Sequence, residues 1–264
     1  MAVPNKVLEH VKKEGMISID DLVDEFQISR TTAMNYLSRL SNLGVIYRIG
    51  YGLYEYGTKN EISLPITLET RKIINLLRNK FGEKNLTIWS LSMLENYTHY
   101  AIGRDLIFVE IKKALEKSIR DVLIQNNYQV VIDPNNRDYY DFSLTNKELV
   151  FIIKRKEEYG TDYKDGLIPF PERMWADLYY YVTRNNLSFS LYELGTILGN
   201  MIESNIVNYD RLLYYSNRRK MRDEIVIILY EILKNTYKDS LSTVLFKGKN
   251  TIEKINEIIK GVSE

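Results

Sequence analysis

The chain has 264 residues, 45% of them hydrophobic, and a formal net charge of +1. This length suits two domains with a sizeable core, and the near-neutral charge excludes a protein that coats polyanions with its whole surface. The absence of cysteine excludes disulfides, thiolate zinc sites and a cysteine nucleophile.

The chain also lacks an apolar run of the roughly 18 residues that a membrane helix needs. We therefore expect a cytoplasmic protein with no membrane contact. The combination of 21 tyrosines with no cysteine favours a thermophilic source.

After an N-terminal amphipathic helix, residues 18–57 contain the elements of a winged helix-turn-helix. Hydrophobic residues at helical spacing predict a first helix over residues 19–26, followed by a turn of three residues. Ser29 can cap a second helix over residues 30–43, and Gly44 ends it. Such a second helix typically enters the major groove of DNA.

The segment that follows the second helix predicts a hairpin wing. Residues 45–49 and 53–56 form two short β-type runs around a glycine-bearing tip. A wing of this kind contacts the DNA backbone or the adjacent groove.

The second helix divides into an apolar stripe, predicted to pack inward, and a polar face. Arginines pair with phosphate or guanine, threonines reach phosphate or a thymine methyl, and asparagine can bind an adenine edge. The side chains predicted to bind DNA are Arg30, Thr31, Thr32, Asn35 and Arg39 of this helix, with Arg48 and Tyr51 of the wing.

The charge balance leaves an alternative in which this winged helix contacts only protein. Residues 1–65 hold seven lysines and arginines against eight acids. From residue 28 to 57, however, there are three arginines and the single acid Glu55. The other acids of the motif, among them Asp20, are expected on the supporting helix, away from the contact face.

Beyond a polar connector ending at Pro65, the pattern predicts a helix over residues 68–81 and then a small α/β sheet. The predicted strands of this sheet are 86–90, 106–111, 128–132 and 149–154, and a helix is predicted over residues 112–126. About four helices follow between residues 172 and 259. The predicted class is α+β: a winged helix-turn-helix domain at 1–65, and a mixed α/β domain with a helical C-terminal part at 66–264.

Several short motifs follow one another in a recognisable order. They are the N-terminal helix-turn-helix, Ile88-Trp89-Ser90, Phe108-Val109-Glu110, Asp133-Pro134, Ile168-Pro169-Phe170-Pro171-Glu172 with Asp177, and Tyr214-Tyr215-Ser216-Asn217-Arg218-Arg219. In this order the chain resembles AbiE-type antitoxins, over roughly residues 4–230. It departs from their pattern at residues 173–176, where the family more often has a lysine followed by aliphatic residues.

The resemblance implies a non-enzymatic antitoxin without a cofactor. Its winged helix would bind inverted repeats in double-stranded DNA upstream of its own operon and repress it. Its C-terminal domain would oppose a nucleotidyltransferase-like toxin, and this type IV neutralisation does not need a stable complex.

A second cationic segment lies near the end of the chain. Arg211, Arg218, Arg219 and Lys220, with two tyrosines among them, suit a nucleic-acid backbone or an acidic partner. The alternative is a solvated helix boundary that neighbouring acids partly neutralise.

Two rival functions remain at this point. One is a stand-alone winged-helix regulator whose C-terminal domain senses a ligand or a partner. The other is a metal-dependent nuclease built on Glu110-Ile111-Lys112, for which the partner acid is missing because Asp105 lies only five residues earlier. His10 and His99 have no metal or catalytic spacing.

Overall fold

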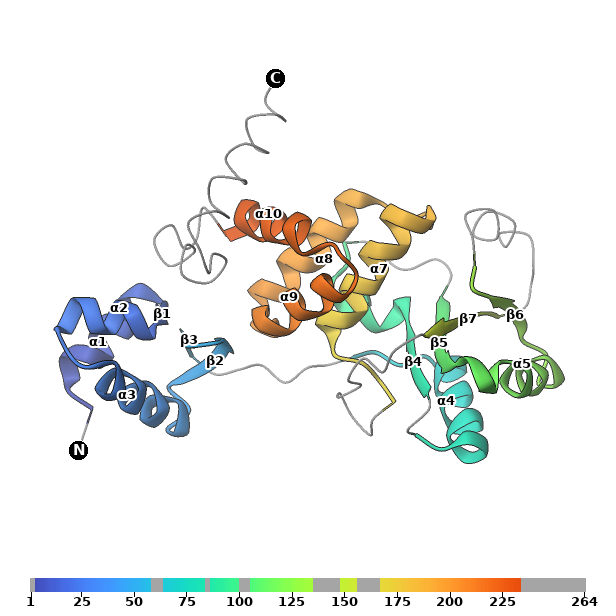
Figure 1. Cartoon of the computed structure of the whole chain (residues 1–264), viewed down its shortest axis with the longest axis horizontal. Coiled ribbons are helices and arrows are strands. Elements are labelled where there is room, and N and C mark those ends of the chain that lie inside the picture. The colour runs from blue at the N-terminus through green and yellow to red at the C-terminus, as the bar shows by residue number, and fades with distance from the viewer. Residues whose placement is uncertain are drawn as a thin grey trace, which may run out of the picture. The chain divides into compact units, whose positions relative to one another are not determined.

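The computed structural model describes residues 3–57, 64–83, 86–99, 105–134, 148–155 and 167–233. The fold is α+β, as predicted (Figure 1). Contacts divide the chain into two compact units, one made of residues 1–61 with those from 205 onward, and one made of residues 62–204. The predicted division near residue 65 stays a prediction. The contacts group the last helices with the winged helix rather than with the α/β sheet.

The first unit opens with a winged helix-turn-helix. Its helices are α1 (Asn5–Glu14), α2 (Ile19–Phe26) and α3 (Arg30–Asn42), and its strands are β1 (Met16–Ser18), β2 (Ile46–Gly50) and β3 (Leu53–Tyr56). The strands form an antiparallel sheet in the order β1-β3-β2. The predicted helices and hairpin are therefore present, and β1 is an additional strand.

Local capping explains the two central helices. Ser18 and Asp21 form a reciprocal capping box, in which the Ser18 Oγ accepts from the Asp21 amide at 3.0 Å and the Asp21 carboxylate accepts from the Ser18 amide at 2.7 Å. Gln27 adopts a left-handed conformation that ends α2. Ser29 then caps α3 through the Thr32 amide at 3.1 Å.

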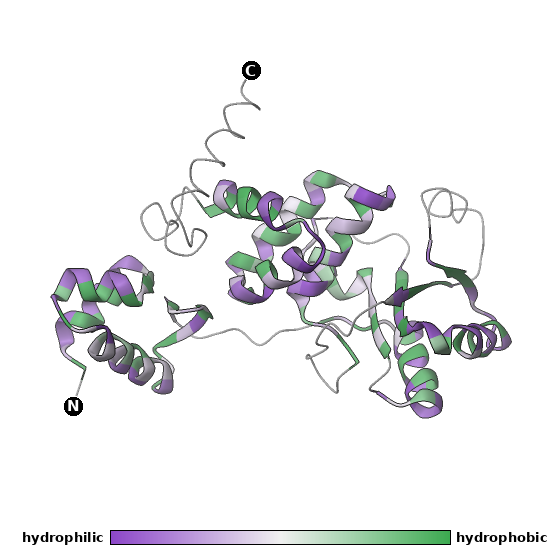
Figure 2. Cartoon of the chain, viewed as in Figure 1, coloured by the Kyte–Doolittle hydropathy of each residue, from purple (hydrophilic) through white to green (hydrophobic). Residues whose placement is uncertain are grey.

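The apolar stripes of these helices meet in one core. Its fully buried members include Val7, Val11, Leu22, Ala33 and Leu37. The amphipathic pattern behind this packing is visible in Figure 2 as green and purple stripes along the helices.

The first unit is completed by two helices from the far end of the described chain, α9 (Tyr209–Arg218) and α10 (Arg222–Leu233). They pack on each other, and both contribute buried side chains, among them Leu212 and Leu229. Helix α9 also packs on strand β2 of the wing.

The second unit is a mixed sheet with helices. In chain order it contains α4 (Leu68–Phe81), β4 (Leu86–Ser90), the 3₁₀ helix η1 (Leu91–Tyr97), β5 (Leu106–Lys112), the 3₁₀ helix η2 (Lys113–Leu115), α5 (Glu116–Gln125), β6 (Gln129–Ile132), β7 (Leu149–Arg155), α7 (Pro171–Asn185) and α8 (Leu191–Glu203). The strand order is β4-β5-β7-β6, with β4 antiparallel to β5 and the other pairs parallel.

An aromatic stack joins the sheet of the second unit to α7. The Trp89 ring stacks on Phe108 with centroids 4.2 Å apart, and Tyr181 of α7 stacks on the same Phe108 at 5.2 Å. Trp175 is fully buried, and its indole nitrogen donates to the Leu194 carbonyl at 2.9 Å. Trp175 and Tyr181 are thus core residues, while Tyr179 and Tyr180 are half-buried.

No helix in the described part of the chain has the length and apolar character needed to cross a membrane.

Candidate nucleic-acid interface

Helix α3 presents the polar face that its periodicity predicts. Ala33, Leu37 and Leu40 are buried against the core. The exposed side chains are Arg30, Thr31, Met34, Asn35, Ser38, Arg39 and Asn42. Of the predicted contacts on this helix, Arg30, Thr31, Asn35 and Arg39 are therefore accessible.

The arginine at the start of α3 has a partner that the sequence did not reveal. Arg30 forms an ion pair with the Asp20 carboxylate in the first turn of α2. The expectation that the acids of the supporting helix lie away from the contact face is therefore wrong for Asp20. The reason is that α2 and α3 pack on each other with the first turn of α2 beside the start of α3, a contact that spacing within one helix does not show.

Thr32 is half-buried and takes part in capping. Its amide donates to the Ser29 Oγ, and the two hydroxyl oxygens lie 2.9 Å apart in a hydrogen bond. The hydroxyl of Thr32 is therefore already engaged within the turn, whereas Thr31 beside it is exposed.

The wing carries the second group of predicted contacts. Arg48 is the exposed residue of β2, and its Nε donates to the Gly50 carbonyl at 2.9 Å. Its guanidinium lies 5.7 Å from the centre of the Tyr51 ring, and Tyr51 is 66% exposed at the tip. The structure thus brings Arg48 and Tyr51 together on one hairpin.

Two features keep the hairpin in shape. Gly52 has a φ of +70°, and a Cβ there would come 3.1 Å from the Ile19 side chain, so the tip requires glycine. The acid of the wing, Glu55, accepts a hydrogen bond from the Tyr47 hydroxyl across the β2–β3 pair. Its charge is therefore engaged within the sheet.

Met34 is an exposed residue of α3 outside the predicted set of contacts. This side chain is 50% exposed on α3, one turn after Arg30. Helical spacing alone places Met34 beside Arg30, one turn along the helix, and could have indicated its exposure. A thioether at this place can pack on a thymine methyl.

The second cationic segment lies on α9 and at its C-terminal end. Arg218 ends the helix, Arg219 caps it, and Lys220 follows in a left-handed conformation with φ of 59°. Arg211 is half-buried in the first turn, two turns from the exposed Arg218. Arg211, Arg218 and Arg219 all have interaction partners within the protein. The structure therefore brings Arg218, Arg219 and Lys220 together at the end of α9 and places Arg211 along the same helix.

The Glu-x-Lys tripeptide on β5 has a different environment from a metal site. Glu110 is 1% exposed and its carboxylate forms an ion pair with the equally buried Arg173 of α7, while Lys112 is exposed. Asp105 accepts instead from the Ser92 amide at 2.9 Å. Among the residues that the structure describes, no group of three His, Cys, Asp or Glu side chains could hold a metal ion.

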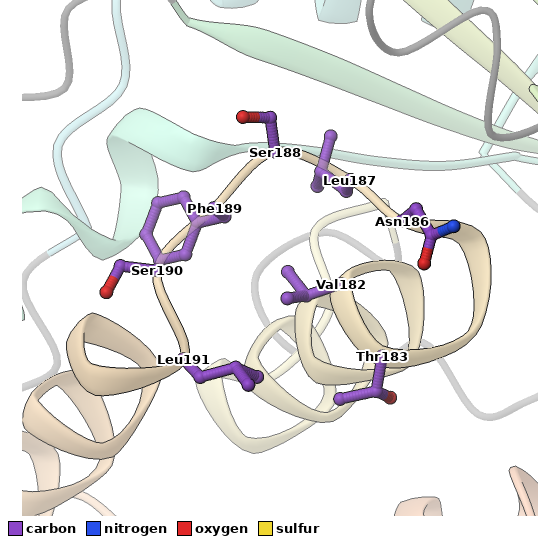
Figure 3. A pocket seen from close by; sticks show the side chains of 8 residues that line it. All are labelled: Val182, Thr183, Asn186, Leu187, Ser188, Phe189, Ser190 and Leu191. Carbon is purple, nitrogen blue, oxygen red and sulfur yellow. The ribbon is translucent and has the colours of Figure 1, made fainter.

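A hollow of about 610 Å³ lies where α7 ends and α8 begins. Figure 3 shows the turn that joins the two helices arching over Val182, with Phe189 beside it. The residues that line it are Val182, Thr183, Asn186, Leu187, Ser188, Phe189, Ser190 and Leu191. None of these side chains is ionisable near neutral pH, so none of them could serve as a general acid or base for the hydroxyl groups in the hollow.

Comparisons with known proteins agree with the winged helix. A model of the DeoR-like helix-turn-helix domain matches residues 4–59. A second model, described as a family of unknown function (DUF6577), matches residues 32–235. A search of curated proteins found no match. The N-terminal region is thus a DeoR-like helix-turn-helix domain, which makes the chain a DNA-binding transcriptional regulator.

Proposed function

The chain belongs to DUF6577, a family of unknown function, and we propose that it is an antitoxin that represses its own operon. The observation that carries the DNA-binding part is the exposed polar face of α3 within a DeoR-like domain. The antitoxin part is supported by the ordered motifs that the chain shares with AbiE-type antitoxins.

In the proposed complex, α3 enters the major groove and the wing follows the backbone. Arg39 is placed to pair with a guanine edge or a phosphate, and Asn35 with an adenine edge. Arg48 and Tyr51 of the wing contact phosphate oxygens. A repressor of this kind reads inverted repeats with two copies of the chain.

The two arginines of α3 differ in what DNA binding demands of them. Arg30 has to exchange or share the Asp20 carboxylate before it contacts DNA. Arg39 is exposed on the last turns of the helix. Replacing Arg39 by alanine should weaken operator binding by about 1–3 kcal/mol, and replacing Arg30 should cost less.

For the antitoxin part, we propose that the cations at the α9–α10 turn serve the opposition to a nucleotidyltransferase-like toxin. Adjacent guanidinium groups such as those of Arg218 and Arg219 hold phosphate or carboxylate groups bidentately. The toxin and the antitoxin act on a common process, so no stable complex is required and no catalytic step is assigned to this chain.

A single cell-based experiment separates the two activities. The full chain is expressed beside the gene adjacent to its own, with a reporter behind the shared promoter. Arg39→Ala should relieve repression but still rescue growth, whereas Arg218→Ala with Arg219→Ala should abolish rescue but still repress. Loss of both activities in either variant, or rescue by neither the wild type nor any variant, would refute this division.

The hollow beside α8 favours one second candidate, a stand-alone regulator with a ligand-sensing C-terminal part. Its size and its mixed lining of apolar and hydroxyl groups suit a small neutral molecule. In that case the neighbouring gene would not encode a toxin, and its expression would not slow growth. The nuclease hypothesis is tested by magnesium-dependent cleavage of DNA by the wild-type chain.

A further inference from the structure

The burial of strand β2 is unusual for a DNA-binding wing. Alternate residues of a strand point to opposite faces, so a wing with one face in solvent should alternate between buried and exposed residues. Ile46 packs in the core of the helical part. Yet Tyr47, which points to the other face, is only 8% exposed, and Ile49, in the β-bulge between Arg48 and Gly50, is 2% exposed. Both faces of β2 are therefore covered, and Arg48 alone on this strand is exposed.

Helix α9 packs on this strand. A Cβ built on Gly50, the last residue of β2, would lie 3.7 Å from the Asp210 Oδ1 and 3.8 Å from its Cγ. Tyr209, the first residue of α9, is 3% exposed. The first turn of α9 thus rests on the end of β2, and Gly50 is buried there without a side chain of its own.

Gly50, which α9 covers, is also the residue that orients Arg48, the cation of the wing. The carbonyl of Gly50 accepts the hydrogen bond from Arg48 Nε at 2.9 Å. Tyr51, which follows Gly50 directly, lies beside the Arg48 guanidinium. Fixing Gly50 therefore fixes both side chains predicted to contact the DNA backbone.

We propose that α9 is a positioning element for DNA binding: it holds the end of β2, and through Gly50 it sets the place of Arg48 on the wing. The proposal rests on the proposed DNA-binding function and adds to it a segment more than 140 residues downstream. A wing that is already ordered loses less conformational freedom when it binds, which favours binding. Residues of α9 need no contact with DNA for this effect.

The test uses size rather than charge, so that electrostatic effects do not interfere. Gly50→Leu places a branched side chain where Asp210 lies and should push α9 off the strand. Gly50→Ala is the matched control, because its Cβ meets only ordinary contacts. Gly50→Leu with Asp210→Ala frees the space again, and Asp210→Ala alone corrects for the lost charge.

The measurement is fluorescence anisotropy with a labelled mixed-sequence duplex of about 30 base pairs, titrated at several salt concentrations. Phosphate contacts do not depend on sequence, so this probe needs no knowledge of the operator. Loss of the Arg48 contact should lower the slope of log K against log salt by about 0.9. We expect this loss, with weaker binding, in Gly50→Leu and in Arg48→Ala, wild-type slopes in Gly50→Ala, and recovery in Gly50→Leu with Asp210→Ala.

A merely structural defect is recognised by combining variants. In an Arg48→Ala background, Gly50→Leu should cause no further change of slope, because both act on one contact. An additional loss in that background, or a wild-type slope for Gly50→Leu alone, would overturn the proposal. Wild-type protein that shows no salt-dependent binding would instead refute DNA binding itself.

A covalent lock gives an independent test that does not depend on a destabilised variant. The chain has no cysteine, so in Gly50→Cys with Asp210→Cys any intramolecular disulfide joins the wing to α9. The oxidised form should bind the duplex with the wild-type slope. Weaker binding of the oxidised than of the reduced form would mean that α9 must leave the wing before DNA binds, which is the opposite of the proposal.

Discussion

Replacing Arg173 by methionine should destabilise the second unit more than most single changes. Arg173 is 1% exposed and lies between two buried acids, with Glu110 in an ion pair and the Asp177 carboxylate 3.5 Å from Nε. Glu110 belongs to β5 at the centre of the sheet, and Arg173 belongs to α7. Methionine keeps much of the volume but leaves these carboxylates without the guanidinium.

The expected magnitude follows from the burial of the network. Removing one member of a fully buried ion pair costs about 3–5 kcal/mol, because the remaining charge is left in a medium that solvates it poorly.

Tryptophan fluorescence during urea unfolding measures this loss selectively. The two tryptophans of the chain, Trp89 and Trp175, are both fully buried in the second unit. The matched control is Arg173→Met with Glu110→Gln, in which removal of the partner charge should recover about half of the deficit. A loss below about 1 kcal/mol, or no recovery in the double variant, would refute the argument from buried charge.

Two further predictions concern the same unit and use the same fluorescence signal. The Asp105 carboxylate accepts hydrogen bonds from the Ser92 amide and hydroxyl at 2.9 and 2.8 Å and from the hydroxyls of Thr67 and Thr70. Asp105→Ala should therefore lower the free energy of unfolding by about 2–3 kcal/mol, and a neutral effect would contradict this account. Burial and then the Glu69 carboxylate raise the pKa of Tyr128 above its ordinary 10.0. Because the pKa of Tyr128 is higher in the folded than in the unfolded protein, the full stability is present below the unfolded pKa and declines as the pH rises beyond it. The free energy of unfolding should therefore fall less steeply above about pH 10 in Tyr128→Phe than in wild type. Equal pH dependence of the two proteins would refute this prediction.

Most elements of the fold could be predicted because their signals are local. The helix at Leu68–Phe81 and the strand at Leu86–Ser90 have the predicted bounds. Capping serines and glycines fix such ends within a few residues. The short strand β1 could not be predicted from the sequence, because three residues carry too little periodicity and form a strand only by pairing with β3.

The site was predictable where exposure follows helical spacing and unpredictable where distant residues meet. Asn35 and Arg39 lie on the exposed face because the opposite face is apolar. The pairing of Arg30 with Asp20 depends on how two helices are oriented across a turn, which spacing within one helix does not show. The burial of Glu110 with Arg173 joins a strand to a helix 63 positions later. Its tripeptide resembled a metal site in sequence only.

The segment 46–50 shows why the grouping of elements was also hidden. In Ile-Tyr-Arg-Ile-Gly, the apolar residues occupy both faces of the strand, a pattern typical of a strand buried on both sides. On a winged helix such a strand needs a cover, and the covering helix lies after the whole α/β unit, beyond residue 204. The apolar pattern could have indicated that a cover exists, but only the spatial contact between Gly50 and Asp210 identifies it. For this reason a fragment that ends near residue 65 would lack the support of its wing, and assays of DNA binding are better made on the full chain.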